Sequence, residues 1–372
     1  MNRKELLGEV DRIVIKVGTS SITRGCSTTS TSFMDSVARQ VKALKDEGKE
    51  ILIVTSGAIG IGLKTMNVIP KPNEIPIKQA AASVGQSILM QKWNESFDKY
   101  GLVTAQILLT MDIYSDREST LNLNNTIDSL LEHKVVPIFN ENDAICIKEI
   151  GPVFGDNDTL SAVIASRTDA DLLLILSDVD GLYDKNPKLY EDAKFIPTVE
   201  SISCEVMDMA GDPTTNVGVG GMKTKIKAAI ICQDAGCRMI IASSDVSDII
   251  LKTVGGEEFG TVFVSDNLLT KKRRWLKSAC SHGIIDIDEG AVEAISNHQS
   301  LLPIGIKGVE GPFNRGDVVS IVCKEKTIAK GIPNYNSDEI FRIRGLHSEK
   351  IGEVLGYKTH DDVFTTENMV IF

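Results

Sequence analysis

The stretch Leu172-Leu-Leu-Ile-Leu176 is entirely aliphatic, and the polar run Ser177-Asp-Val-Asp-Gly-Leu-Tyr183 follows it at once. A strand that is apolar at every position is buried on both faces, which is typical of parallel sheets covered by helices. In such sheets, ligands bind beyond the carboxyl ends of the strands. The stretch therefore predicts an α/β fold and the sheet edge at which a functional site should lie.

Short apolar runs alternate with helical patterns on both sides of this strand. We expect further strands at residues 12–17, 50–55, 103–109, 135–140 and 238–242. We expect helices at residues 31–48, 77–100, 122–132, 158–166 and 223–235. This β-α-β alternation predicts a doubly wound, mainly parallel sheet sandwiched by helices.

The pattern changes after about residue 260, where the segments become short and are separated by turns. Strands are expected there at residues 283–287, 305–309, 318–323 and 327–333. A chain of 372 residues is also too long for one ordinary domain. We therefore predict a first domain over residues 1–260, a linker over 261–280, and a small β-barrel domain over 281–372.

The net charge of −11 is unevenly spread along the chain. The part from Lys271 onward holds 14 Lys and Arg against 14 Asp and Glu, so all the excess acid lies before it. An acidic domain binds nucleic acid and anionic membranes poorly. The seven cysteines form no Cys-x-x-Cys pair, no signal-peptide pattern is present, and the apolar runs are too short to cross a bilayer. We therefore expect a cytoplasmic protein with free thiols and no membrane partner.

Three loops rich in glycine and hydroxyl groups are suited to binding anions. Val217-Gly-Val-Gly-Gly-Met-Lys-Thr-Lys225 precedes a helical pattern, whereas Lys16-Val-Gly-Thr-Ser20 and Val54-Thr-Ser-Gly-Ala-Ile-Gly60 each follow a strand. Glycine lets backbone N–H groups approach a phosphate, and helix N-termini favour negative charge. The first loop lacks the Walker A spacing. Singly, each could be a plain surface loop; together they predict a phosphate site.

Two clusters of acidic and amide residues lie near the strand expected at 135–140. They are Asn140-Glu-Asn-Asp143 and Gly155-Asp-Asn-Asp-Thr159. Asp and Asn side chains can hold an ammonium group, and Asp can contact Mg²⁺. The alternative is a turn followed by a helix that Asp158 caps. Similarly, the run after Leu176 is placed to meet a ribose and a base, or forms only a β-turn at Asp180-Gly181.

The loops contain no nucleophile paired with a base. All five histidines lie outside them, and so do all the cysteines apart from Cys146 near the Asn and Asp cluster. A substrate carboxylate, with a pKa near about 4, is already ionised at neutral pH and needs no general base. The absence fits phosphoryl transfer to a carboxylate, which requires charge neutralisation and alignment.

These loops together resemble the amino acid kinase family over nearly the whole chain, and the Asn-Glu-Asn-Asp and Gly-Asp-Asn-Asp pair is similar to its glutamate-phosphorylating members. The tail resembles a PUA domain, a small β-barrel found in RNA-modifying enzymes. The residues that carry this second resemblance are Lys272-Arg-Arg-Trp275, Asp288-Glu-Gly290, Leu301-Leu-Pro-Ile-Gly-Ile-Lys307, Arg315-Gly-Asp317 and Tyr335-Asn-Ser-Asp338. The resemblance implies an amino acid kinase fold followed by a PUA domain.

The resemblance also implies a role for each matching residue. Lys16 and Lys225 would flank the transferred phosphoryl group, and Asp158 would orient both lysines. Glutamate would be held by Ser56, Gly57, Ala58, Asp143 and Asn157. ATP would be held by Lys16, Ser177, Asp178, Val219, Gly220, Gly221, Met222, Lys223, Thr224 and Lys225. Ser177 stands where the family commonly has a threonine. Val219 stands where the family commonly has a threonine or a serine, so a hydroxyl is lost there.

The implied reaction is ATP with L-glutamate to give ADP and L-glutamyl 5-phosphate, the first step of proline synthesis. Mg²⁺ would be the cofactor, held mainly by the ATP phosphates, with no certain protein ligand. The resemblance further implies inhibition by proline, a homo-oligomer (dimer or tetramer), and a glutamyl-phosphate reductase as a partner.

Two other functions stay open. The chain could phosphorylate another acid, such as aspartate or acetylglutamate, although an acylated amine would not favour Asp143. It could instead bind RNA through the tail, but that part is neutral, and its basic cluster Lys271–Arg274 is better explained by packing, so RNA is not expected. The apolar segment Ile75–Val84 could form a subunit interface or belong to the core.

Overall fold

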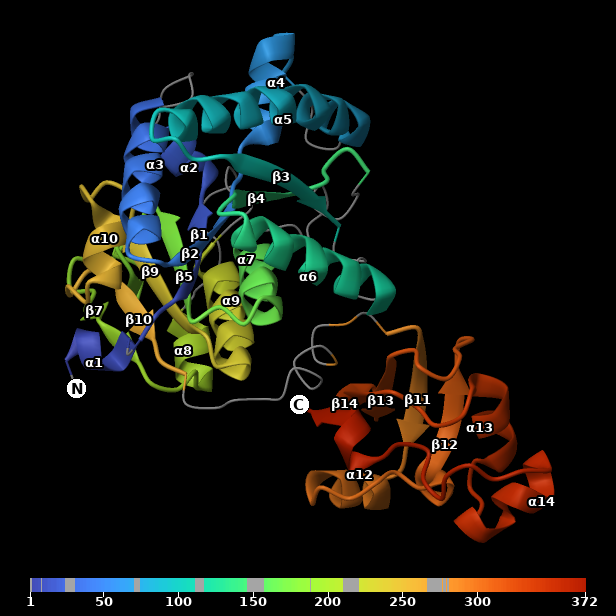
Figure 1. Ribbon diagram of the computed structural model, residues 1–372. Helices are drawn as coiled ribbons and strands as arrows, with labels where there is room; N and C mark the ends of the chain where they lie inside the picture. Colours follow the sequence, from blue (N-terminus) through green and yellow to red (C-terminus); the bar gives the residue numbers. More distant parts are fainter. Residues whose placement is uncertain are drawn as a thin grey trace. The chain divides into compact units, whose positions relative to one another are not determined.

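The computed structural model describes residues 2–7, 9–23, 31–69, 74–110, 117–145, 157–187, 189–209, 221–265, 276, 279 and 281–372. The chain divides into two compact units (Figure 1). The first comprises Met1–Met111 and Leu121–Leu268, and the second comprises Asp112–Thr120 and Leu269–Phe372. Each unit has a hydrophobic core of its own.

The first unit is built on an eight-stranded sheet with the strand order β3-β4-β2-β1-β5-β9-β10-β8. The strands are β1 (Arg12–Val17), β2 (Glu50–Val54), β3 (Thr104–Leu109), β4 (Val136–Glu141), β5 (Leu172–Ser177), β8 (Thr198–Val199), β9 (Arg238–Ser243) and β10 (Thr261–Phe263). All neighbours pair in parallel except β9 and β10. The mainly parallel sheet confirms the predicted fold class.

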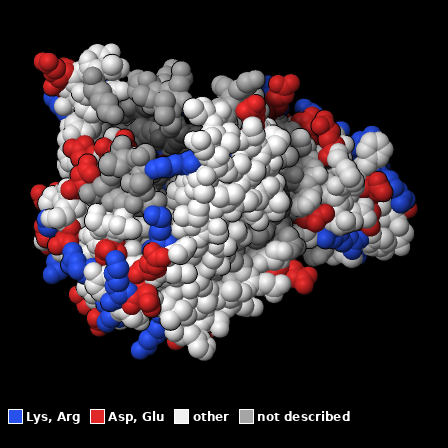
Figure 2. Space-filling view, turned by 90° about the horizontal axis from the view of Figure 1, so that it is seen from above, with Lys and Arg blue, Asp and Glu red and all other residues white. Residues whose placement is uncertain are grey.

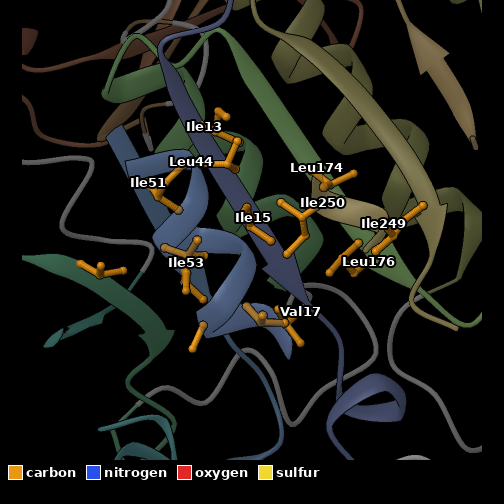
Figure 3. Close-up of a cluster of buried hydrophobic side chains, with 14 of the residues drawn as sticks. Ile13, Ile15, Val17, Leu44, Ile51, Ile53, Leu174, Leu176, Ile249 and Ile250 are labelled. Atoms are coloured by element: carbon orange, nitrogen blue, oxygen red, sulfur yellow. The ribbon is translucent and has the colours of Figure 1, made fainter. Parts of the chain in front are cut away.

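Helices cover both faces of this sheet. On one face, Leu44 of α3 (Thr31–Asp46) and Ile249 of α10 (Ile249–Val254) join the core formed by alternate residues of β1, β2 and β5 (Figure 3). Trp93 of α5 (Ile75–Asp98) belongs to the same core. The other face is covered by α7 (Asn157–Arg167) and α9 (Met222–Ala235), which contact each other and the sheet. All five residues from Leu172 to Leu176 are fully buried, which confirms that β5 is covered on both sides.

The remaining helices of the first unit connect these layers. They are α1 (Arg3–Leu7), α2 (Thr19–Thr23), α4 (Ala58–Met66), α6 (Arg117–Glu132) and α8 (Cys204–Met209). Two-residue strands, β6 (Leu182–Tyr183) and β7 (Phe195–Ile196), pair with each other and were not predicted, because two residues are too few to show a period. No helix in the described part of the chain is long and apolar enough to cross a bilayer.

The second unit contains a five-stranded sheet with the order β12-β11-β13-β14-β15. Its strands are β11 (Gly283–Ile287), β12 (Ile306–Glu310), β13 (Val319–Cys323), β14 (Lys326–Gly331) and β15 (Met369–Ile371), so the predicted strand-rich tail is confirmed. Short helices accompany them: α12 (Glu289–Ser296), α13 (Ser337–Ile343) and α14 (Ile351–Leu355), with single turns at Pro303–Gly305, Ser348–Lys350 and Thr366–Asn368. These helices were not predicted, because none is longer than eight residues.

The predicted boundaries at residues 260 and 280 stay a prediction. In the structure, β10 lies just beyond the first of them and pairs with β9 in the sheet of the first unit. The basic cluster Lys271–Arg274 lies outside the described residues.

Candidate active site

Two lysines meet one buried carboxylate at the carboxyl end of the sheet. Lys16 Nζ, from the end of β1, lies 2.6 Å from Asp158 Oδ1. Lys225 Nζ, from the first turns of α9, lies 3.0 Å from Asp158 Oδ2. Asp158 is fully buried and the two lysines are nearly so. Lys16 is 142 residues and Lys225 is 67 residues from Asp158 in the chain, and the fold brings the three side chains together. Their roles in phosphoryl transfer stay a prediction.

The charges of this cluster favour an anion. Two ammonium groups share one carboxylate, so the three side chains together carry a net charge of +1 in a buried place. Ammonium groups bind phosphate oxygens through charge-assisted hydrogen bonds, so two lysines that meet at one place are suited to a phosphate. The alternative explanation of Asp158 as a helix cap does not describe its position, because α7 begins one residue earlier and both carboxylate oxygens meet lysines.

The N-terminus of α7 also carries the side-chain amide of Asn157. Asn157, directly before Asp158, points its Nδ2 at Ser56 Oγ (2.6 Å) and at the backbone oxygen of Thr55 (2.8 Å). Gly57, the residue after Ser56, has a φ of 103°, a conformation that glycine adopts readily. It precedes the first turn of α4, which begins at Ala58. The predicted substrate residues Ser56, Gly57, Ala58 and Asn157 are therefore neighbours, adjacent to the lysine cluster.

Asp143 lies beside a cavity of about 280 Å³. Residues of α5 and β3 line this cavity together with the end of β4 and the loop after it; they include Gln86, Gln106, Glu141 and Asn142. Within the described residues, no group of three His, Cys, Asp or Glu side chains is arranged to hold a metal ion.

The predicted nucleotide residues are only partly described. Gly221 precedes α9, whose first turn contains Met222, Lys223 and Thr224. Thr224 Oγ1 donates to Asp158 Oδ2 at 3.1 Å, which ties the start of α9 to the lysine cluster. Val219 and Gly220 lie outside the described residues.

Ser177 and Asp178 stand at the carboxyl end of β5, where the sequence placed a nucleotide contact. Ser177 Oγ donates to Asp178 Oδ1 at 3.1 Å. Burial and the neighbouring Asp180 carboxylate raise the pKa of Tyr183 in the same loop, so its phenol stays protonated and donates to Asp180. The contact of this loop with a nucleotide stays a prediction.

Sequence reasoning missed several polar residues that support the site. Asn140 is almost fully buried and bonds to Asn157, and Gln86 on α5 bonds in turn to Asn140. Thr55 is fully buried and accepts a hydrogen bond from Trp93 Nε1 at 3.0 Å. Asn140 stood inside a motif that the sequence analysis had singled out. No spacing rule could have found Gln86, because it reaches the site only through the packing of α5.

Comparison with known proteins identifies the family of the chain. Residues 11–243 match the model of the amino acid kinase family, and residues 283–355 match that of the PUA domain. The chain is 52% identical to the glutamate 5-kinase of Methanosarcina mazei (99% of this chain, 98% of that protein) and 42% identical to that of Caldanaerobacter subterraneus subsp. tengcongensis (97% of each). The carbamate kinase from Giardia lamblia bound to AMP-PNP has a similar fold (TM-score 0.51, 17% identity, 69% of this chain and 99% of that one).

The chain belongs to the amino acid kinase family. Its similarity over nearly the full length places it with the glutamate 5-kinases, followed by a PUA domain at the C-terminal side. It is therefore an enzyme of the kinase class.

Proposed function

We propose that this chain transfers the γ-phosphoryl group of ATP to the γ-carboxylate of L-glutamate, giving ADP and L-glutamyl 5-phosphate. One observation carries the proposal: Asp158 holds Lys16 and Lys225, while its neighbour Asn157 holds Ser56. A place for transferred phosphate and a place for a small polar substrate thus meet at the start of one helix. The relatives named glutamate 5-kinases support the choice of substrate.

The reaction needs alignment and charge neutralisation more than it needs acid–base groups. The glutamate carboxylate is the nucleophile, and it is ionised at neutral pH. Lys16 and Lys225 offset the negative charge that builds up on the phosphoryl oxygens, and Asp158 keeps both ammonium groups in place. Ser56, Asp143 and Asn157, with the backbone of Gly57 and Ala58, hold glutamate, and Ser177, Asp178 and residues 219–225 hold ATP.

Mg²⁺ fits this site only together with the nucleotide. Asp158, the buried carboxylate closest to the lysines, already meets two ammonium groups and is poorly suited to bind a metal as well. The ion would therefore be held mainly by ATP phosphates, where it would offset their charge. Calorimetry should show binding of MgATP but no binding of Mg²⁺ to the protein alone.

The proposal is tested by supplying MgATP and L-glutamate and trapping the acyl phosphate with hydroxylamine. Hydroxamate should form with L-glutamate and not with L-aspartate or N-acetylglutamate. Hydroxamate that forms only with another acid would show that this acid, and not glutamate, is the substrate. ADP release without hydroxamate would indicate a different acceptor. If no acid supports turnover, structured RNA becomes the next ligand to test on the PUA domain.

We further propose that this reaction opens proline synthesis in the cytoplasm and that proline inhibits it at a site overlapping that of glutamate. The product is an acyl phosphate, which is chemically labile, so a glutamyl-phosphate reductase that consumes it directly is the fitting partner. A proline titration at fixed glutamate should lower the rate, and added glutamate should restore it. An unchanged rate would remove proline from the proposal.

A homo-oligomer is also proposed. The face viewed from above in Figure 2, which looks onto the α4 and α5 side of Figure 1, has a wide area without charged side chains. Between Ile75 and Gln91, α5 carries a single charged residue, Lys78. Copies of a chain with net charge −11 repel one another least where such a face meets its counterpart. Light scattering should give a mass of two or four chains.

A further inference from the structure

A chain of side-chain amides runs from the candidate substrate site to the edge of the sheet. Asn157 Nδ2 shares its two hydrogens among Thr55 O, Ser56 Oγ and Asn140 Oδ1, the last at 3.0 Å. Asn140 Nδ2 donates to Gln86 Oε1 at 2.8 Å. Gln86 Nε2 then donates to Gln106 Oε1 on β3 at 3.3 Å. Asn140 and Asn157 are almost fully buried, whereas Gln106 is exposed. The four amides thus form a relay from the buried site to the surface.

The direction of the relay is set by one backbone group. The carbonyl oxygen of Thr55 can only accept, and it lies 2.8 Å from Asn157 Nδ2. The NH₂ end of Asn157 is thereby fixed, so Asn140 must present its oxygen to Asn157 and its own NH₂ to Gln86. Gln86 must in turn present an oxygen, because an NH₂ there would face another donor. Each amide thus determines the orientation of the next.

The orientation leaves an acceptor for the substrate. Asn157 Oδ1 is buried, and among the described residues it has no hydrogen-bond partner. A buried carbonyl-type oxygen without a partner costs about 1–3 kcal/mol, which a ligand that donates a hydrogen bond would recover. If Asn140 turned its amide around, Asn157 would lose one of the contacts that hold its oxygen in this position.

Gln86 is held firmly enough to perform this task. The preceding residue, Gly85, packs so closely on α4 that a Cβ there would lie 1.8 Å from the backbone oxygen of Ala58. The first turn of α4 follows directly on Ser56 and Gly57. The backbone of α5 at Gln86 is therefore placed directly against the loop that offers Ser56 to the site.

We propose that Gln86 is a positioning residue for recognition of the substrate's amino group. Its Oε1 fixes the amide of Asn140, which fixes Asn157 with Oδ1 free to accept from the α-ammonium group of glutamate. This rests on the proposed function. It predicts that Gln86 affects binding of an amine-bearing substrate and leaves the transfer step to the lysine cluster.

The test compares two substitutions of Gln86 in the full-length chain. Gln86→Glu keeps an oxygen that can accept from Asn140 Nδ2. Gln86→Met keeps the length of the side chain but removes that oxygen. We expect Gln86→Met to raise the KM for glutamate about tenfold, with kcat and the KM for ATP within twofold of wild type. Gln86→Glu should restore the KM to within about threefold. Gln91→Met, on the same helix and bonded only to Glu95 in the described contacts, is the matched control.

Glutarate, which has both carboxylates of glutamate but no amino group, separates positioning from general damage. As a competitive inhibitor it should bind wild type and Gln86→Met equally. A wild-type KM in Gln86→Met, an equal loss in both Gln86 variants, or a fall in kcat without a change in KM would overturn the proposal. The hydroxamate assay is run in parallel on the wild-type protein. If no hydroxamate forms with glutamate there, the proposed function is refuted separately from the role of Gln86.

Discussion

At the scale of single residues, the buried group formed by Lys16, Asp158 and Lys225 dominates the site. One carboxylate meets two ammonium groups, one from the strand β1 and one from the helix α9. The geometry makes the three residues act as a unit, so the loss of any one should affect the function of the others.

Replacing Lys225 by alanine tests the role of this unit. The substitution removes one of the two charges that face the transferred phosphoryl group, and we expect kcat to fall by a factor of about 10³ or more. Glutamate binding should persist, because Ser56 and Asn157 bond to each other without Lys225. Hydroxamate formation measures turnover and calorimetry measures binding. Retained turnover would refute the assigned role.

Substitution of Asp158 should lower stability and activity more than substitution of an acidic residue at the surface. In Asp158→Asn the buried lysines lose the carboxylate that both of them contact, and removing one partner of a buried pair costs about 3–5 kcal/mol. We expect both a lower melting temperature and a kcat reduced at least a hundredfold. Asp46→Asn serves as the control, because its pair with Lys42 is exposed and contributes little. Equal effects of the two substitutions would contradict the prediction.

At the scale of elements, α4 and α5 touch backbone to backbone. A Cβ added at Gly62 would lie 1.7 Å from the carbonyl oxygen of Ala81, so even a methyl group forces the helices apart. The N-terminus of α4 is the substrate loop and α5 carries Gln86, so the packing of these two helices sets the geometry of the site.

Gly62→Ala should therefore destabilise the protein and weaken glutamate binding together. Overpacking of this kind costs about 1–3 kcal/mol, and the displaced helix should raise the KM for glutamate. Gly60→Ala on the same helix is the control, because its added Cβ meets no atom within 4 Å and alanine favours a helix by about 0.5–1 kcal/mol. Thermal unfolding and steady-state kinetics of the two variants give the comparison. A Gly62→Ala protein that is as stable as wild type would show that the helices can separate freely.

In the second unit, α13 is stabilised at its start by a reciprocal cap between Asn336 and Glu339. Burial tends to raise the pKa of Glu339, but hydrogen bonds from Tyr357, the Asn336 backbone and Arg315 outweigh it, and the pKa is lowered. A carboxyl whose pKa is lower in the folded state stabilises the fold above its unfolded pKa, and this contribution is lost as the pH falls through the folded value. Glu339→Gln should thus melt below wild type at pH 7, and the difference should shrink as the pH falls below the unfolded pKa of Glu339. A difference independent of pH would place the effect in the cap alone.

At the scale of the whole molecule, each of the two units has a core of its own. Every residue of the candidate site that the structure describes belongs to the first unit, and the cores of the two units share no residue. A chain ending at residue 268 should therefore fold and keep kcat within a few fold of the full-length value. Circular dichroism checks the fold and the hydroxamate assay checks activity. A folded but inactive fragment would assign a catalytic task to the second unit.

Much of this arrangement could be predicted from the chain. The aliphatic run at Leu172–Leu176 and the polar loops after successive strands determine the α/β sheet and its functional edge, because parallel strands bring their carboxyl ends together. What could not be predicted depends on packing between distant segments. Gln86 is one polar residue among several on α5, and only the close approach of two helices at Gly62 and Gly85 brings it to Asn140. Two-residue strands such as β8 are likewise defined by their partners alone.

The placement of β1 between β2 and β5 bears on how the chain is made. Glu50, which bonds to Arg12 on one side, is 38 residues away, whereas Asp171, which accepts from the backbone N–H of Asp11 on the other side, is 160 residues away. A ribosome adding roughly 5–20 residues per second delivers β5 only after on the order of 10–30 s. During that interval one edge of the apolar strand β1 has no neighbour, and such an edge invites pairing with other chains. The nascent protein therefore depends most on chaperones before its fifth strand emerges.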